Sequence, residues 1–179
     1  MNIFQALNLS IFVGTLSALV GGLSRLPGTI GSWSLTLWLF VALFLLLRLK
    51  IVLDDHAYFS KAKTKNMNFK VGFLAAIASW LFWALGAYSV SQLQQAYFTV
   101  GIAITISTLW ILAVALLEGA TRQQYAWLAV NAILVVLLWA AYRRESPTGD
   151  WPTWCFLGAA ILLVLFDLVF SKSIPELDQ

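Results

Sequence analysis

The stretch that decides the fold runs from Trp33 to Leu53 and reads WSLTLWLFVALFLLLRLKIVL. It lacks the strict alternation of a half-buried strand, and its length matches the roughly 20 apolar residues that a helix needs to cross a bilayer core. Residues 161–166, ILLVLF, form an equally continuous apolar run. A transmembrane β-barrel would show alternating segments of about ten residues instead. Both stretches therefore predict membrane-spanning helices.

The composition of the whole chain agrees with this prediction. The chain has 179 residues, of which 61% are hydrophobic and 11% charged, and its mean hydropathy is +0.85. Soluble chains have about 45–50% apolar and about 25% charged residues. We therefore predict an all-α integral membrane protein. The composition excludes a disordered chain and a nucleic-acid-binding domain, and the single cysteine, Cys155, excludes a disulfide scaffold.

Five segments have the length and apolarity of spans, and a sixth, residues 3–23, is interrupted by polar side chains such as Gln5 and Asn8. This segment has neither a basic start nor the charged face of an interfacial helix. It carries small residues at the spacing Ala18-x-x-x-Gly22, and also Ser10-x-x-x-Gly14, which favours close helix packing. We therefore favour a polytopic bundle of six helices over five, forming one domain over residues 1–179 without a soluble domain. The predicted spans are residues 3–23, 33–53, 71–90, 97–117, 125–142 and 154–171.

The distribution of basic residues predicts the orientation, because lysine and arginine are enriched on the cytoplasmic side. With alternating spans, three of the eleven basic residues fall on one side, namely Arg25, Arg143 and Arg144. The other eight are Arg48, Lys50, Lys61, Lys63, Lys65, Lys70, Arg122 and Lys172. We therefore expect an inner (plasma) membrane protein with both termini and a basic loop, 54–70, in the cytoplasm. The lysines of the loop, Lys61, Lys63, Lys65 and Lys70, are candidates for contact with anionic lipid or with a cytoplasmic protein partner.

Asp167 is the ionisable residue that interrupts the last span. Ionisable groups inside a span are rare and often functional. Asp167 lies only about 6–8 Å from the inner boundary by helical rise, so a partner such as Arg48 would satisfy it. We favour such structural pairing over a role in transport.

Other polar residues near or within the predicted spans are also candidates for lining a path. Glu118 and Arg122 are spaced for an ion pair at a helix end. Asn131 is expected to make an interhelical hydrogen bond. Thr105 and Thr108 place two hydroxyls on one side of a helix, where they would line a wet path or simply pack helices.

Asp54, Asp55 and His56 form the densest group of residue types that bind metals. Consecutive helical positions point about 100° apart, so the three side chains cannot all close on one ion. We expect these acids to be solvated beside the lysines, and we predict no metal site within one chain; a site shared between subunits is the remaining option.

The sequence contains no catalytic constellation that we can identify, so we predict that the protein is not an enzyme. The single histidine excludes a bis-histidine haem within one chain. A retinal Schiff base needs a buried lysine within a helix, whereas we expect Lys50 and Lys172 at span ends. We therefore predict no cofactor.

The leading functional hypothesis is a homo-oligomer in the lipid bilayer that forms or gates a permeation path for an ion or small solute. The alternative is an anchoring or sensing subunit that docks a cytoplasmic partner through the basic loop, for example in a bacterial stress or antiviral response. A weaker alternative is a subunit that handles lipid or quinone.

Overall fold

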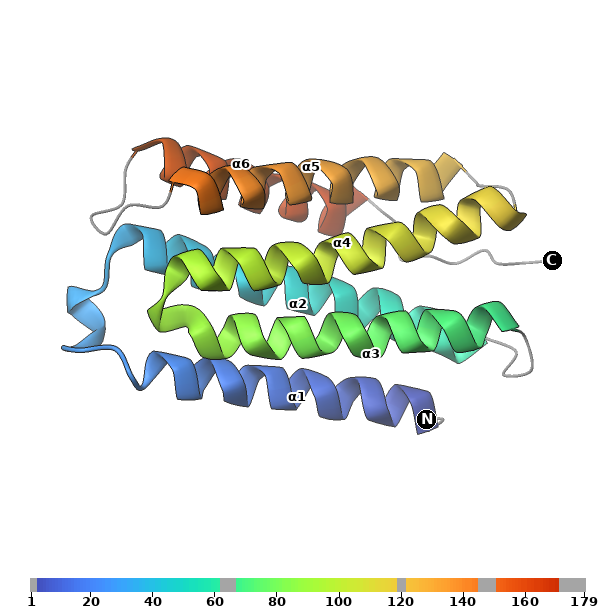
Figure 1. The fold of residues 1–179 in the computed structure, drawn as a ribbon, viewed down its shortest axis with the longest axis horizontal. Coiled ribbons are helices and arrows are strands. Elements are labelled where there is room, and N and C mark those ends of the chain that lie inside the picture. The colour runs from blue at the N-terminus through green and yellow to red at the C-terminus, as the bar shows by residue number, and fades with distance from the viewer. Residues whose placement is uncertain (1–2, 62–66, 119–121, 145–150, 171–179) are drawn as a thin grey trace.

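The computed structural model describes residues 3–61, 67–118, 122–144 and 151–170. All regular structure in these ranges is helical, and it includes two single 3-10 turns, η1 (Ile30–Ser32) and η2 (Ser89–Ser91). The long helices are α1 (Ile3–Leu23), α2 (Leu35–Lys61), α3 (Met67–Tyr88), α4 (Leu93–Glu118), α5 (Arg122–Arg144) and α6 (Trp151–Phe170). Figure 1 shows these helices running alongside one another.

Within the described ranges, six helices are long and apolar enough to cross a membrane, which agrees with the six predicted segments. The ambiguous first segment is a continuous helix, α1, and it packs along both α2 and α3. The candidate spans end at Asp54 and begin again at Gly72, close to the bounds of the predicted loop 54–70, but part of this segment is helical, because α2 continues to Lys61 and α3 begins at Met67. Hydropathy marks where a helix stops being apolar, and no proline or glycine stops α2 at that point.

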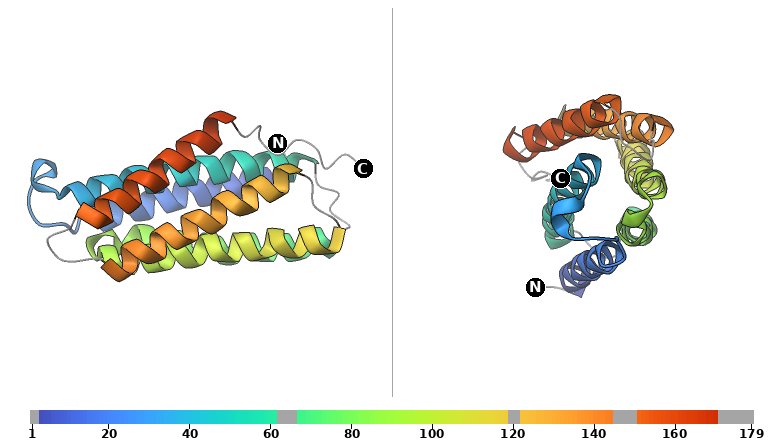
Figure 2. Two further views of the ribbon diagram at one scale, coloured as in Figure 1. Left: turned by 90° about the horizontal axis from the view of Figure 1, so that it is seen from above. Right: turned by 90° about the vertical axis from the view of Figure 1, so that its left-hand side faces the viewer.

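The six long helices form a ring, which is visible end-on in Figure 2. Around the ring, α1 packs against α3, followed by α4, α5 and α6, and α2 closes the circle between α6 and α1. A hydrogen bond links α6 to α2. The indole N–H of Trp154 on α6 donates it to the hydroxyl of Thr36 on α2, at 2.9 Å. Helices that are far apart in sequence therefore face a common interior.

One of the two small-residue pairs predicted in α1 provides a close helix approach. A Cβ atom added to Gly22 would come within 2.5 Å of the Ala87 carbonyl oxygen at the end of α3. The same addition at Gly14 would meet nothing within 4 Å. Gly22 therefore allows the end of α1 to dock on α3, and Gly14 does not contribute to this packing.

Four aromatic side chains, which we call the aromatic layer, fill the ring interior in the half near the α3–α4 connection. The layer consists of Phe40, Phe44, Trp83 and Tyr97, all at most 1% exposed. Phe40 packs edge-on against Tyr97 with 5.2 Å between centroids, and Phe44 packs in the same way against Trp83 at 5.3 Å. Edge-to-face packing at these distances is favourable. The layer closes this half of the interior.

Candidate functional site

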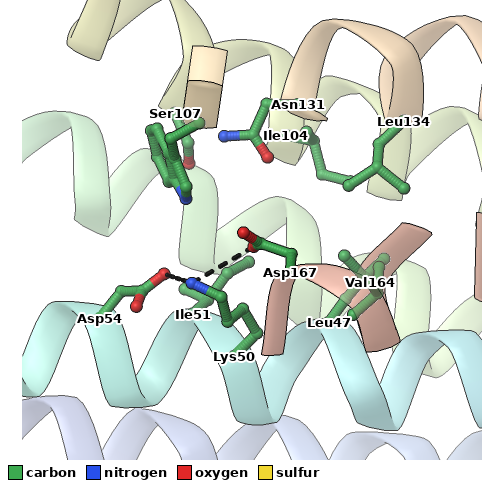
Figure 3. Close-up of a pocket in the computed structure, with 11 residues that line it drawn as sticks. Leu47, Lys50, Ile51, Asp54, Ile104, Ser107, Asn131, Leu134, Val164 and Asp167 are labelled. Carbon is green, nitrogen blue, oxygen red and sulfur yellow. Dashed lines mark hydrogen bonds and ion pairs between the residues drawn. The ribbon is translucent and has the colours of Figure 1, made fainter. Parts of the chain in front are cut away.

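The other half of the ring interior contains a group of polar side chains that we call the polar cluster. It consists of Lys50, Asp54, Ser107, Asn131 and Asp167, which come from α2, α4, α5 and α6. Figure 3 shows these side chains converging on a small cavity. The volume of the cavity is about 20 Å³, which is room for a single water molecule.

The centre of the cluster is one ammonium group between two carboxylates. Lys50 Nζ lies 2.5 Å from Asp54 Oδ2 and 3.3 Å from Asp167 Oδ2. Lys50 and Asp54 are four residues apart on α2 and so share a helix face, whereas Asp167 comes from α6 (Figure 3). The three residues are between 4% and 7% exposed. With both carboxylates ionised, this group carries one net negative charge in a largely apolar interior.

The expected pairing of Asp167 with a residue such as Arg48 is corrected by the structure, in which Asp167 pairs with Lys50. Arg48 and Lys50 are two positions apart on α2 and therefore point about 200° apart. The guanidinium carbon of Arg48 lies 5.4 Å from the centre of the Trp83 ring and 6.0 Å from that of Phe12. Arg48 is fully buried, and these cation–π contacts place it beside the aromatic layer.

Lys50 and Asp54 are site residues that the sequence analysis missed. Lys50 was predicted at the end of a span, which agrees with the candidate span Leu35–Asp54, but Asp54 was expected to be solvated, whereas both side chains are buried. Their spacing could have predicted the pair, because a lysine and an aspartate four residues apart share a helix face. The opposite charges of such a pair neutralise each other, and the pair can therefore be buried.

Among the remaining candidates, Asn131 lines the cavity, but the two predicted threonines do not. Thr105 and Thr108 donate hydrogen bonds of 2.8 and 2.7 Å to the carbonyl oxygens of Gly101 and Ile104, in the preceding turn of α4. Their hydroxyls are thus satisfied by their own helix. The sequence prediction of a hydroxyl stripe lining a wet path is not supported at these two positions.

A different pair of hydroxyls connects the cavity to α3. Ser107 Oγ lines the cavity and lies 3.1 Å from Ser79 Oγ, and either hydroxyl can be the donor. Both hydroxyls also lie within hydrogen-bond distance of the Ala103 carbonyl oxygen, at 3.2 Å from Ser107 and 3.0 Å from Ser79. Sequence reasoning missed this pair because single serines are common in apolar helices, where they pack against neighbours.

Several predicted residues have side chains outside the described part of the structure. They are Asp55, His56, Lys61, Lys63, Lys65, Lys70, Glu118 and Arg122. Among the side chains that are described, no three of the histidine, cysteine, aspartate and glutamate residues come together as a metal site.

The polar cluster has the chemistry of a site for a cation or a proton. Carboxylates can accept either species, and ammonium, amide and hydroxyl groups can donate hydrogen bonds to a water molecule. The aromatic layer separates this cluster from the opposite end of the ring. Comparison of the chain with protein-family models, with curated proteins and with solved structures finds no match.

Proposed function

We propose that the chain is a multi-pass membrane protein whose helix ring encloses a gated permeation path for a small ion or solute. The distribution of apolar and charged side chains supports a membrane environment, because it is the reverse of that in a soluble protein. Large apolar residues are exposed on each long helix, among them Val13, Leu45, Leu74, Leu116, Val136 and Leu162. A protein in water avoids large exposed apolar patches and keeps its charges outside, so a lipid surround is the fitting solvent.

The observation that carries the permeation path is the burial of Lys50, Asp54 and Asp167 inside the ring. Ionisable residues within a span are rare and costly, and they often mark a functional site. Buried ion pairs are often no more stabilising than apolar side chains of the same volume. A bundle needing only stability has no use for three such groups, which favours a functional role.

The position of these charges also supports a path through one chain. All three side chains face the ring interior rather than the outer surface (Figure 3). We therefore place the path inside each copy and keep the homo-oligomer as a separate proposal. The charged end of the path lies at the end of the ring where α1 begins and α6 ends, and it faces the cytoplasm in the topology that we propose, with the protein in the inner membrane.

The aromatic layer makes the proposed path a gated one. Phe40, Phe44, Trp83 and Tyr97 fill the half of the interior that faces away from the polar cluster. Passage therefore requires a second arrangement of these side chains or of the helices that carry them.

Reconstitution of the purified protein in liposomes tests this function. Gradients of H⁺, Na⁺, K⁺ and Cl⁻ are imposed one at a time, and ion movement is recorded for the wild type, for Asp167→Asn and for Thr108→Val. We expect flux of one species that Asp167→Asn greatly reduces. Thr108→Val is the matched control, because this hydroxyl bonds its own helix, and it should leave flux unchanged. Absence of all four fluxes, or flux indifferent to Asp167→Asn, would contradict the proposal.

Docking of a cytoplasmic partner is the second candidate function. It is favoured by the four lysines between residues 61 and 70, which extend from the last residue of α2 into the first turn of α3, at the end of the ring that holds the polar cluster. The two candidate functions are distinguished by neutralising these lysines, as described in the Discussion.

A further inference from the structure

The size of the cavity at the polar cluster limits what it can hold. Its volume of about 20 Å³ exceeds the roughly 10–15 Å³ that one water molecule needs on the same measure. A hydrated alkali cation or an organic solute would need the surrounding helices to move apart. A proton needs no such space, because it passes along hydrogen bonds between groups already in place.

The net charge of the polar cluster also fits a proton. Both aspartates contact one ammonium, so their nearest oxygens are at most about 6 Å apart. Among the described side chains, none of the others that line the cavity carries a charge; they are Leu47, Ile51, Ile104, Ser107, Trp127, Asn131, Leu134 and Val164. One added proton makes the group of Lys50, Asp54 and Asp167 neutral. Since burial disfavours net charge, the cluster is suited to take up one proton at a time.

The two ion-pair distances indicate which carboxylate takes the proton. Asp54 holds the ammonium of Lys50 at 2.5 Å. Asp167 lies farther from Lys50, at 3.3 Å. Asp167 is thus the carboxylate that the ammonium holds less closely, and this geometry favours it as the acceptor.

The Ser107–Ser79 pair provides two further groups that can transfer a proton. Each hydroxyl can turn its hydrogen either to the other hydroxyl or to the Ala103 carbonyl oxygen. Such a pair can pass a proton by giving one hydrogen to its neighbour while accepting another, and this exchange changes no oxidation state. It leads from the cavity towards α3, one helical turn from Trp83 in the aromatic layer.

Resting on the function proposed above, we propose that the species exchanged at the polar cluster is a proton, with Asp167 as its acceptor and the Ser107–Ser79 pair as its relay. In the step, a hydronium ion at the cavity loses its proton to an Asp167 oxygen. An O–H bond forms on the carboxyl group, a water molecule remains, and the Lys50–Asp54 pair stays intact.

The test uses liposomes that contain the full-length protein and a pH-sensitive dye, with K⁺ and valinomycin present to compensate charge. A pH step is applied without an alkali-cation gradient, and Na⁺ and K⁺ gradients are applied separately at equal pH to liposomes without valinomycin, which itself carries K⁺. We expect the wild type to carry protons and neither alkali cation. We expect Asp167→Asn to slow proton flux about 100-fold, Ser107→Ala to slow it severalfold, and Thr108→Val to leave it unchanged.

The outcomes separate this inference from the proposed function. Alkali-cation flux that depends on Asp167, without proton flux, overturns the proton and keeps the permeation path. Absence of every flux overturns both. Proton flux that is unaffected by Ser107→Ala overturns the relay. If Asp167→Asn does not fold, Asp167→Glu replaces it and should retain proton flux, and the ion selectivity of the wild type tests the proton without any variant.

Discussion

Lys50 on α2 and Asp167 on α6 lie 3.3 Å apart, nitrogen to oxygen, and this ion pair joins the two helices that close the ring. The hydrogen bond from Trp154 to Thr36 joins the same two helices near their other ends. The contact between α2 and α6 thus includes one polar interaction in each half of the bundle. Both interactions connect α2, the second long helix, to α6, the last one.

The first prediction concerns the ammonium at the centre of the cluster. Lys50→Met should lower the free energy of unfolding by about 3–5 kcal/mol, because it leaves two buried carboxylates without their cation. The triple variant Lys50→Met, Asp54→Asn, Asp167→Asn should recover most of this loss, since no charge remains. Unfolding in detergent, followed by circular dichroism, measures both. A single variant as stable as the triple variant would contradict the role of Lys50.

The second prediction compares two glycines on α1. Gly22→Ala should destabilise the protein by about 1–3 kcal/mol, because the new Cβ meets backbone oxygen of α3 that cannot move aside. Gly14→Ala, on the same helix, should be neutral or slightly stabilising, since nothing lies within 4 Å and alanine favours the helix. Thermal unfolding in detergent measures the pair. Equal effects of the two changes would show that α1 does not dock through Gly22.

The third prediction concerns topology in the membrane. The even number of long helices brings Ile3 and Phe170 to the same end of the bundle (Figure 1), and the basic residues indicate that this end is cytoplasmic. Reporters fused before Asn2 and after Gln179 should both be active in the cytoplasm. A reporter at the first position that is active only outside would support the five-helix alternative, with α1 outside the spanning bundle.

The fourth prediction distinguishes a permeation path from a docking subunit. Neutralising Lys61, Lys63 and Lys65 together should leave liposome flux unchanged, because these lysines lie outside the predicted spans. Each such lysine near the membrane surface contributes about 1 kcal/mol of attraction to anionic lipid or protein. A docking subunit should therefore lose its partner in co-purification, both in this variant and at high salt. Loss of a partner, with no flux in either form, would favour docking over permeation.

The helices could be predicted from the sequence because each contains a long apolar run, and hydropathy detects such runs. The same method failed at Lys50 and Asp54. It reads a charge as the end of a span, and it does not register that a lysine and an aspartate four residues apart neutralise each other. Asp167 was identified because it stands alone within an apolar run.

The choice between Arg48 and Lys50 as the partner of Asp167 depends on how α2 is rotated about its axis. Phe44 sets this rotation by packing on Trp83, and Arg48, four residues later, follows it to the same ring. Lys50 is thereby turned towards α6. Composition carries no information on which helices become neighbours in a ring, so neither this pairing nor the Ser79–Ser107 contact could be derived from the sequence.

The spacing of Lys50 and Asp54 on a single helix has a consequence for biogenesis. During synthesis α2 leaves the ribosome long before α6 exists, so its charges enter the translocon without their final partner. The pair within α2 needs no other helix to form, and it shields the lysine during insertion. Asp167 is the last of the three to arrive, and it meets a lysine already held in position. A chain that has not closed its ring therefore leaves the Asp167 carboxylate without its lysine.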